Sequence, residues 1–308
     1  MFADYSWSEL SSIFAMQGFA GLTLFSVLVL MALGLAIIFG QMGVINMAHG
    51  EFMILGAYVT YLVSTLAQAH APALMPITFF ISMGLAFIVS GAAGMAVEWG
   101  LIRFLYRRPL DTLLATWGLS LIMQQAFRSI FGAREVGVTL PDWMMGSLAL
   151  TDMVEVPING LIVMGITLTI TLAVWLLMYR SRFGARVRAV VQNRPMAGAV
   201  GIDTEKVDRL TFGLGCGIAG IAGSAFTMIG STGPSAGQLY IVDTFLVVVF
   251  GGAASLIGTL ASAFAISQAQ STMEFFLSGS MAKVLILLTV VAILMVRPQG
   301  LFTLKVRN

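Results

Sequence analysis

The chain has 308 residues, of which 58% are hydrophobic and only 10% are charged, and its mean hydropathy is +0.95. One soluble core cannot bury that much apolar surface, so the composition excludes an ordinary globular enzyme and predicts a protein in lipid. Sixteen basic and fourteen acidic residues give a net charge of +2, which by itself identifies no partner. We expect membrane lipid and no nucleic acid around this chain.

Continuous apolar runs at 21–39 and 161–178 are long enough to be membrane helices, whereas a membrane β-barrel would show shorter alternating segments. The predicted fold is all-α, a polytopic integral membrane helical bundle forming a single domain over residues 1–308. Its predicted helices cover 19–39, 50–66, 74–100, 110–131, 158–179, 210–230 and 280–296.

The stretch 241–272 is ambiguous because it contains two apolar runs separated by Gly251 and Gly252. We interpret it as two short segments hinged at these glycines. An N-terminus outside and a C-terminus inside require an odd number of crossings, which nine segments satisfy. The alternative, a re-entrant half-helix followed by one span, gives eight, so we expect about eight or nine membrane segments.

The charged residues predict the orientation of the chain. Positively charged loops of membrane proteins face the cytoplasm. Acidic residues such as Asp4 and Glu9 mark the N-terminus as external, together with the acidic loop 132–157. The segments predicted to be cytoplasmic contain three basic clusters: Arg103, Arg107 and Arg108; Arg180, Arg182, Arg186, Arg188, Arg194, Lys206 and Arg209; and Arg297, Lys305 and Arg307.

A polar interruption, Gly40 to Glu51, lies between the first two apolar helices and contains Asn46 and His49. Ionisable side chains within a membrane normally face a cavity or a partner and mark a pathway. A second glycine-rich break at 230–237 follows the helix that begins near Leu210. Glycine-broken helices in corresponding places of two halves are typical of transporters that bind their substrate near the bilayer midplane.

Three segments carry a resemblance to a known family: Gly-Gln-Met-Gly-Val-Ile-Asn-Met-Ala-His-Gly-Glu-Phe at 40–52, Arg-Pro-Leu-Asp-Thr-Leu-Leu-Ala-Thr-Trp-Gly-Leu-Ser-Leu-Ile-Met-Gln-Gln at 108–125, and Arg-Pro-Gln-Gly-Leu-Phe at 297–302. They resemble permease subunits of branched-chain amino acid type ABC importers, and the likeness covers about 18–302. The second segment, with Gly-Ser-Thr-Gly-Pro at 230–234 and Tyr-Ile-Val-Asp at 240–243, resembles the urea-importing branch most.

The resemblance implies a multi-pass protein of the bacterial inner membrane that works with ABC ATPase subunits, a second and paralogous permease subunit, and a periplasmic solute-binding protein. The phosphate-binding loop of such ATPases requires Gly-Lys followed by Ser or Thr. The lysines Lys206, Lys283 and Lys305 follow Glu, Ala and Leu. We therefore expect a transport subunit that is not an enzyme, has no cofactor or metal, and relies on separate ATPases.

The basic segment 180–209 is the predicted cytoplasmic coupling loop, where an ATPase would dock. Residues 185–191 and 196–202 have helix-compatible spacing, and Pro195 suits the first turn of a short helix that begins after Asn193. The alternative is a merely solvated loop. The family resemblance assigns ATPase coupling to Asn193, Arg194, Ala197, Gly201 and Ile202.

Seven polar side chains are candidates for the solute path: Asn46, His49, Glu51, Thr116, Gln124, Gln125 and Gln268. Amides both donate and accept hydrogen bonds, which suits neutral urea. The alternative is that such side chains hold helices together. At least one of Gln124 and Gln125 is then structural, since they project in different directions, and His49 could pair with Glu51 rather than contact solute.

Two enzyme-like patterns have simpler interpretations. Gly-Cys-Gly-Ile-Ala-Gly at 215–220 matches a dinucleotide-binding fingerprint but lies within an apolar helix, where small residues favour helix packing. Ser280 to Lys283 matches a serine-lysine pattern, although Lys283 is expected to reach the membrane interface. We also predict Asp111 and Asp243 to be helix N-caps and Glu98 to be an interfacial carboxylate.

We therefore predict a permease that passes urea by alternating access. Three alternatives remain: the same machine carrying branched-chain or other amino acids, a passive channel for small neutral solutes, and an intramembrane enzyme. A channel would need neither an ATPase nor the long basic loop. An enzyme would need a nucleophile-base set or a metal cluster, and the sequence offers no convincing example of either.

Overall fold

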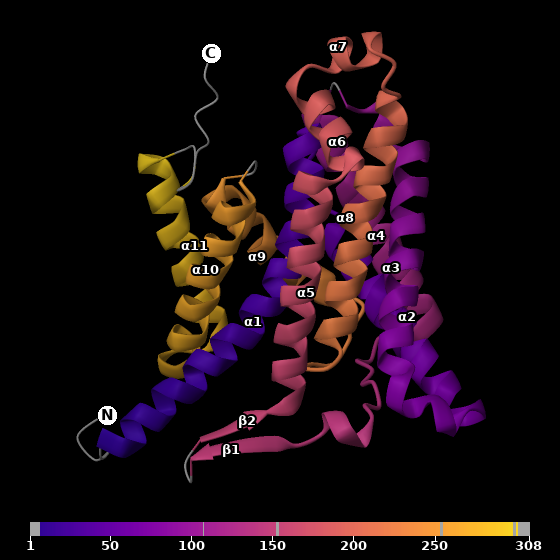
Figure 1. Cartoon of the computed structure of the whole chain (residues 1–308). Helices are drawn as coiled ribbons and strands as arrows, with labels where there is room; N and C mark the ends of the chain where they lie inside the picture. The colour runs from indigo at the N-terminus through magenta and orange to yellow at the C-terminus, as the bar shows by residue number, and fades with distance from the viewer. Residues whose placement is uncertain (1–6, 107, 152–153, 253–254, 298–299, 301–308) are drawn as a thin grey trace.

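The computed structural model of the chain describes residues 7–106, 108–151, 154–252, 255–297 and 300. Long helices run side by side, and a short β-hairpin lies across one end (Figure 1). The elements are α1 (Trp7–Met42), α2 (His49–His70), η1 (Pro72–Leu74), α3 (Met75–Gly100), η2 (Ile102–Phe104), α4 (Pro109–Phe131), η3 (Asp142–Met144), β1 (Ser147–Thr151), β2 (Val154–Pro157), α5 (Ile158–Arg180), α6 (Arg182–Gln192), α7 (Arg194–Ala199), α8 (Thr204–Phe226), α9 (Ala236–Gly251), α10 (Leu256–Phe276) and α11 (Gly279–Val296). The predicted helical architecture is confirmed.

Six helices in the described part of the chain are long and apolar enough to cross a membrane. They cover Glu9–Met42, His49–His70, Pro72–Phe104, Ile158–Arg180, Thr204–Phe226 and Gly279–Val296. Helix α9 is apolar but shorter. The structure thus agrees with a polytopic membrane protein, while the number of crossings stays a prediction.

The interruption between α1 and α2 begins at Gly43, whose φ of +64° only glycine adopts readily. The α-helix ends at Met42, and regular structure resumes at His49. A second interruption separates α8 from α9. The two predicted broken regions are therefore present, and they meet: a Cβ at Gly237 would lie only 2.7 Å from the carbonyl oxygen of Gly50.

Helix α8 packs against α1, α2 and α3 through glycines. A Cβ at Gly215 would lie 2.6 Å from the carbonyl oxygen of Gly34 on α1, and one at Gly220 would lie 2.5 Å from the carbonyl oxygen of Ala86 on α3. Such distances leave no room for a side chain. The predicted packing role of the 215–220 glycines is confirmed, and the segment is no nucleotide-binding loop.

The predicted hinge at 251–252 is confirmed. Helix α9 ends at Gly251, Gly252 has a φ of +90°, and α10 begins at Leu256. The prediction for Asp243 is wrong: this residue lies inside α9, and its Oδ2 is 2.9 Å from Nζ of Lys283 on α11. Lys283 is thus held by an ion pair, because the two helices bring opposite charges together.

The prediction for Asp111 is also wrong. Helix α4 begins at Pro109, and Asp111 lies in its first turn, where it pairs with Arg108 at 3.5 Å. Position 108 is the N-cap but provides no side-chain cap hydrogen bond. A carboxylate in the first turn is still favourable because it faces the positive end of the helix dipole.

The two ends of the bundle differ in character (Figure 1). Helices α6 and α7 and the C-terminal end of α11 lie at one end, and the hairpin lies at the other. Strands β1 and β2 pair antiparallel with Ser147 opposite Pro157, so part of the predicted 132–157 loop is ordered. Of the charges used to predict orientation, Asp4, Arg107, Lys305 and Arg307 lie outside the described residues. Which end faces the cytoplasm stays a prediction.

Candidate functional site

The interruption between α1 and α2 is held by polar side chains. The Oδ1 atom of Asn46 accepts a hydrogen bond from the backbone N–H of Ala48 at 3.1 Å, and the hydroxyl of Thr116 on α4 accepts one from the N–H of Met47 at 3.1 Å. These bonds satisfy backbone donors that the broken helix leaves without partners. Asn46 and Thr116 are both fully buried.

Glu51 is the centre of a buried polar group. Its Oε1 accepts hydrogen bonds from the amide of Gln124 at 2.9 Å and from the hydroxyl of Ser120 at 3.1 Å. Its Oε2 is buried and has no hydrogen-bond partner among the described residues. Gly237 on α9 lies so close that a Cβ there would be 3.1 Å from Oε1 of Glu51. The carboxylate therefore lies where the two broken helices meet.

His49 faces a different neighbour. Its Nε2 is 3.2 Å from the carbonyl oxygen of Met31 on α1, and its ring packs against Gly34. Its Nδ1 is buried without a partner in the described structure. Since His49 and Glu51 bond to different helices, the structure supports no pairing between them.

The remaining candidates separate into two sets. Asn46, His49, Glu51, Thr116 and Gln124 are buried around the start of α2. Gln125, the next residue of α4, is exposed, so the two neighbouring glutamines project into different surroundings. Gln268 is half-buried on α10, and its Nε2 donates to the carbonyl of Gly18 at 3.3 Å. The structure does not bring these last two residues to the group around Glu51.

Ser120 and Gly237 also contact Glu51, although sequence reasoning did not select them. A signal for Ser120 exists in α4, where a polar residue recurs every fourth position on one buried face: Thr112, Thr116, Ser120 and Gln124. Residues four apart share one side of a helix. Gly237 lies at the end of the predicted break at 230–237, but nothing in the sequence indicates that it meets Glu51.

The basic loop forms two short helices. Asn193 is the N-cap of α7, and its Oδ1 accepts from the N–H of Met196 at 3.0 Å, with Pro195 in the first turn as predicted. Helix α7 is shorter than the predicted 196–202 segment. It ends at Ala199 because Gly201 adopts a φ of +86°.

The residues that the resemblance assigned to ATPase coupling occupy different environments. Ala197 is 3% exposed and packs with the buried valines Val187, Val190 and Val207, and half-buried Ile202 joins them. The outer surface of the loop is formed by Met196 and Val200, which are 61% and 69% exposed.

Charged residues connect the base of this loop to the bundle. Asp208 on α8 pairs with Arg194 at 2.6 Å and accepts a hydrogen bond from Gln41 on α1 at 3.1 Å. Glu98, two residues before the end of α3, is buried, pairs with Arg209 at 3.3 Å and accepts from the hydroxyl of Tyr106, while its place at the membrane interface stays a prediction. Burial, aided by the bond to Glu98, raises the pKa of the Tyr106 phenol and keeps it a donor.

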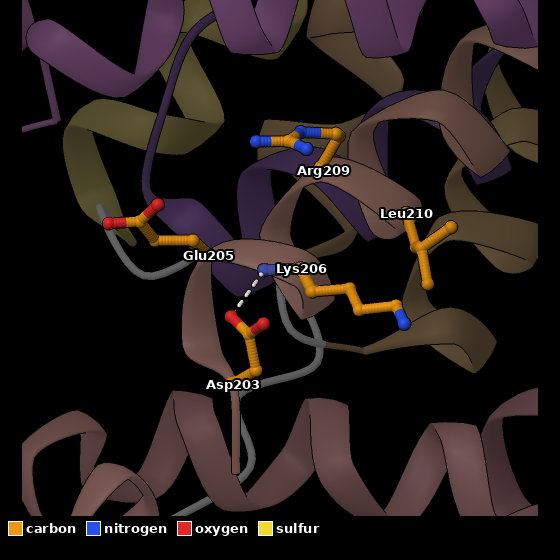
Figure 2. A pocket seen from close by; sticks show the side chains of 5 residues that line it. All are labelled: Asp203, Glu205, Lys206, Arg209 and Leu210. Carbon is orange, nitrogen blue, oxygen red and sulfur yellow. Dashed lines mark hydrogen bonds between the residues drawn. The ribbon is translucent and has the colours of Figure 1, made fainter.

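An open cavity of about 460 Å³ lies beside these residues, at the start of α8 (Figure 2). It is lined by Asp203, Glu205, Lys206, Arg209 and Leu210. Asp203 caps α8 by accepting from the backbone N–H of Lys206 at 3.0 Å. Among the described residues, no group of three His, Cys, Asp or Glu side chains could hold a metal ion.

Comparison with known proteins gives a consistent result. Residues 18–294 match the family described as branched-chain amino acid transport system / permease component. The high-affinity branched-chain amino acid transport system permease protein LivH of Escherichia coli (strain K12) is 28% identical over 311 residues, which cover 96% of this chain and 97% of LivH. The corresponding protein BraD of Pseudomonas aeruginosa is 26% identical over 294 residues, covering 91% and 93%. No solved structure gives a significant match.

Proposed function

Because this chain belongs to the permease component family of branched-chain amino acid transport systems, we propose that it forms the membrane path of an ATP-driven importer and passes a branched-chain amino acid. All of the similar proteins quoted above carry that substrate in their names. The chain is a transport subunit without ATPase activity of its own. Hydrolysis takes place on partner subunits of the ABC transporter complex.

The observation that carries the proposal is the meeting of the two interrupted helices. Gly50 and Gly237 touch through their backbones, and Glu51, Ser120 and Gln124 form a buried polar group beside them. Broken helices that meet inside a bundle are where transporters place their substrate sites, and movement of one half against the other gives alternating access. We assign the path to this place, with Asn46, His49 and Thr116 at its border.

The partners follow from the same proposal. ATPase subunits dock on α6 and α7, and a paralogous permease subunit completes the path. A periplasmic binding protein delivers the solute at the hairpin end. The protein lies in the inner membrane with its N-terminus outside and its C-terminus in the cytoplasm. Gln125 and Gln268 lie apart from the group around Glu51 and are assigned no part in the path.

Urea is the second candidate, and one observation favours it. The buried group around Glu51 contains a carboxylate, amides, hydroxyls and an imidazole, but no Lys or Arg among its described members. An amino acid could pair its ammonium with Glu51, but its carboxylate would have no cationic partner among these members, which is unfavourable away from water. Urea carries no charge and has both donors and an acceptor for such groups. The segments at 108–125, 230–234 and 240–243 also resemble the urea-importing branch.

The decisive experiment is uptake into proteoliposomes that contain this chain with its ATPase and permease partners and the binding protein. Labelled leucine and labelled urea are offered separately, with and without ATP. We expect ATP-dependent uptake of leucine. Uptake of urea without uptake of leucine would show that urea is the substrate. Solute entry that needs neither ATP nor the ATPase subunits would show that the protein is a channel and not an importer.

A further inference from the structure

One buried carboxylate joins the docking loop to the end of α1. Asp208 has a side chain that is only 1% exposed. Its Oδ2 is 2.6 Å from the guanidinium of Arg194, the first residue of α7, and its Oδ1 accepts from the Nε2 of Gln41, 167 residues away in the chain. A buried charge is stable only when its neighbours compensate it, so Asp208 fixes both groups in place.

A second set of contacts holds Arg194 from the other side. Its guanidinium lies 5.3 Å from the centre of the Tyr106 ring, a cation-π geometry. The Tyr106 hydroxyl donates to Glu98 on α3, and Glu98 pairs with Arg209, the neighbour of Asp208 on α8. Arg194 therefore keeps both contacts during a movement of α7 only if Asp208 and Tyr106 move with it.

Gln41 links this network to the broken segment. It lies in the last turn of α1, two residues before Gly43, where the helix ends, and five before Asn46. Helix α1 is fixed to α8 at Gly34 by backbone contact with Gly215. The end of α1 extends about 12 Å beyond that contact at 1.5 Å per residue. Along this extension, Gln41 bonds α1 to α8 through Asp208.

We propose that Asp208 is a positioning residue that couples the docking loop to the solute path: a shift of α7 acts through Arg194 and Asp208 on Gln41 and so on the break at 43–48. This inference rests on the proposed function. It assigns a role to Asp208 and Gln41, which the family resemblance did not single out. The test measures coupling between the two sites directly.

The test uses the complete transporter in proteoliposomes and the solute that the uptake assay identifies, leucine or urea. Asp208→Asn keeps the shape of the side chain and removes its charge. We expect the stimulation of ATP hydrolysis by loaded binding protein to fall about ten-fold, within the range typical of coupling between two sites. The matched control is Asp111→Asn, the same chemical change at an exposed carboxylate on α4 outside segment 180–209, which should leave stimulation unchanged.

A double-mutant cycle separates transmission from general damage. If Arg194 acts through Asp208, Arg194→Ala combined with Asp208→Asn should lose no more stimulation than Asp208→Asn alone. Additive losses would overturn the inference. Stimulation retained in Asp208→Asn would also overturn it and leave the proposed function standing. If loaded binding protein does not stimulate ATP hydrolysis by the unmutated complex, both the proposed function and this inference are wrong.

A second measurement tests the inference even if the transporter carrying Asp208→Asn does not assemble. Met47→Cys in a Cys216→Ala background places a thiol in the break, and its labelling rate is compared in nucleotide-free and vanadate-trapped complexes. The rate should differ between the two states in the parent, and Gln41→Leu should abolish that difference while the complex stays assembled. A difference that persists in Gln41→Leu would show that the signal takes another route.

Discussion

Gln124→Leu removes the closer of the two donors to Glu51 and leaves Oε1 with only the hydroxyl of Ser120. Hydrogen bonds to a charged group contribute about 1.5 to 3 kcal/mol, which corresponds to roughly ten- to a hundred-fold in rate if the loss falls on the limiting step. We therefore expect a less stable protein and uptake reduced by that factor. Gln125→Leu makes the same chemical change at the exposed neighbouring position and should alter neither quantity.

The pair Glu51→Leu with Gln124→Leu distinguishes a path from a structural contact. Replacing both partners of a buried hydrogen bond by apolar groups is nearly neutral for stability. We expect thermal unfolding in detergent to return toward the parent value, while uptake stays low because the solute has lost its polar partners. If uptake recovers together with stability, Glu51 and Gln124 do not line the solute path and serve only to pack the helices.

Two further predictions concern orientation and docking. In a Cys216→Ala background, Ser147→Cys on β1 and Ala185→Cys on α6 should react with impermeant thiol reagents from opposite sides of the membrane, and labelling from the same side would reject the orientation. Replacing the exposed apolar residues of α7, as in Met196→Asp with Val200→Asp, should prevent ATPase subunits from co-purifying while membrane insertion is unaffected. These positions are better probes than Gly201, where a φ of +86° would strain any side chain. ATPase that still co-purifies would show that docking takes place elsewhere.

The sequence predicts features that depend on nearby residues. The break before His49, the hinge at Gly251 and the cap at Asn193 all arise from local backbone chemistry. The polar face of α4 can also be predicted from nearby residues. The four-residue spacing of its polar side chains includes Gln124 and leaves out Gln125. Reading that repeat as a buried face requires recognising that polar residues of a membrane bundle point inward rather than toward lipid.

Pairings between distant residues could not be predicted in this way. Asp243 and Lys283 are 40 residues apart, and Glu98 and Arg209 are 111 apart. Each residue alone fits a helix cap or an interfacial charge, and only the packing of the helices shows which opposite charges meet. The same limit applies to Gly237, since its contact with Gly50 depends on where α9 crosses α2.

The glycine contacts of α8 also restrict how the molecule can change shape. Where carbonyl oxygens of α1 and α3 already press against Gly215 and Gly220, a slide of one helical turn would drive side chains into backbone. Sliding of α8 along α1 or α3 is therefore excluded. Opening and closing of the protein is left to rotation of helices against one another and to bending at the two places where the helices are already broken.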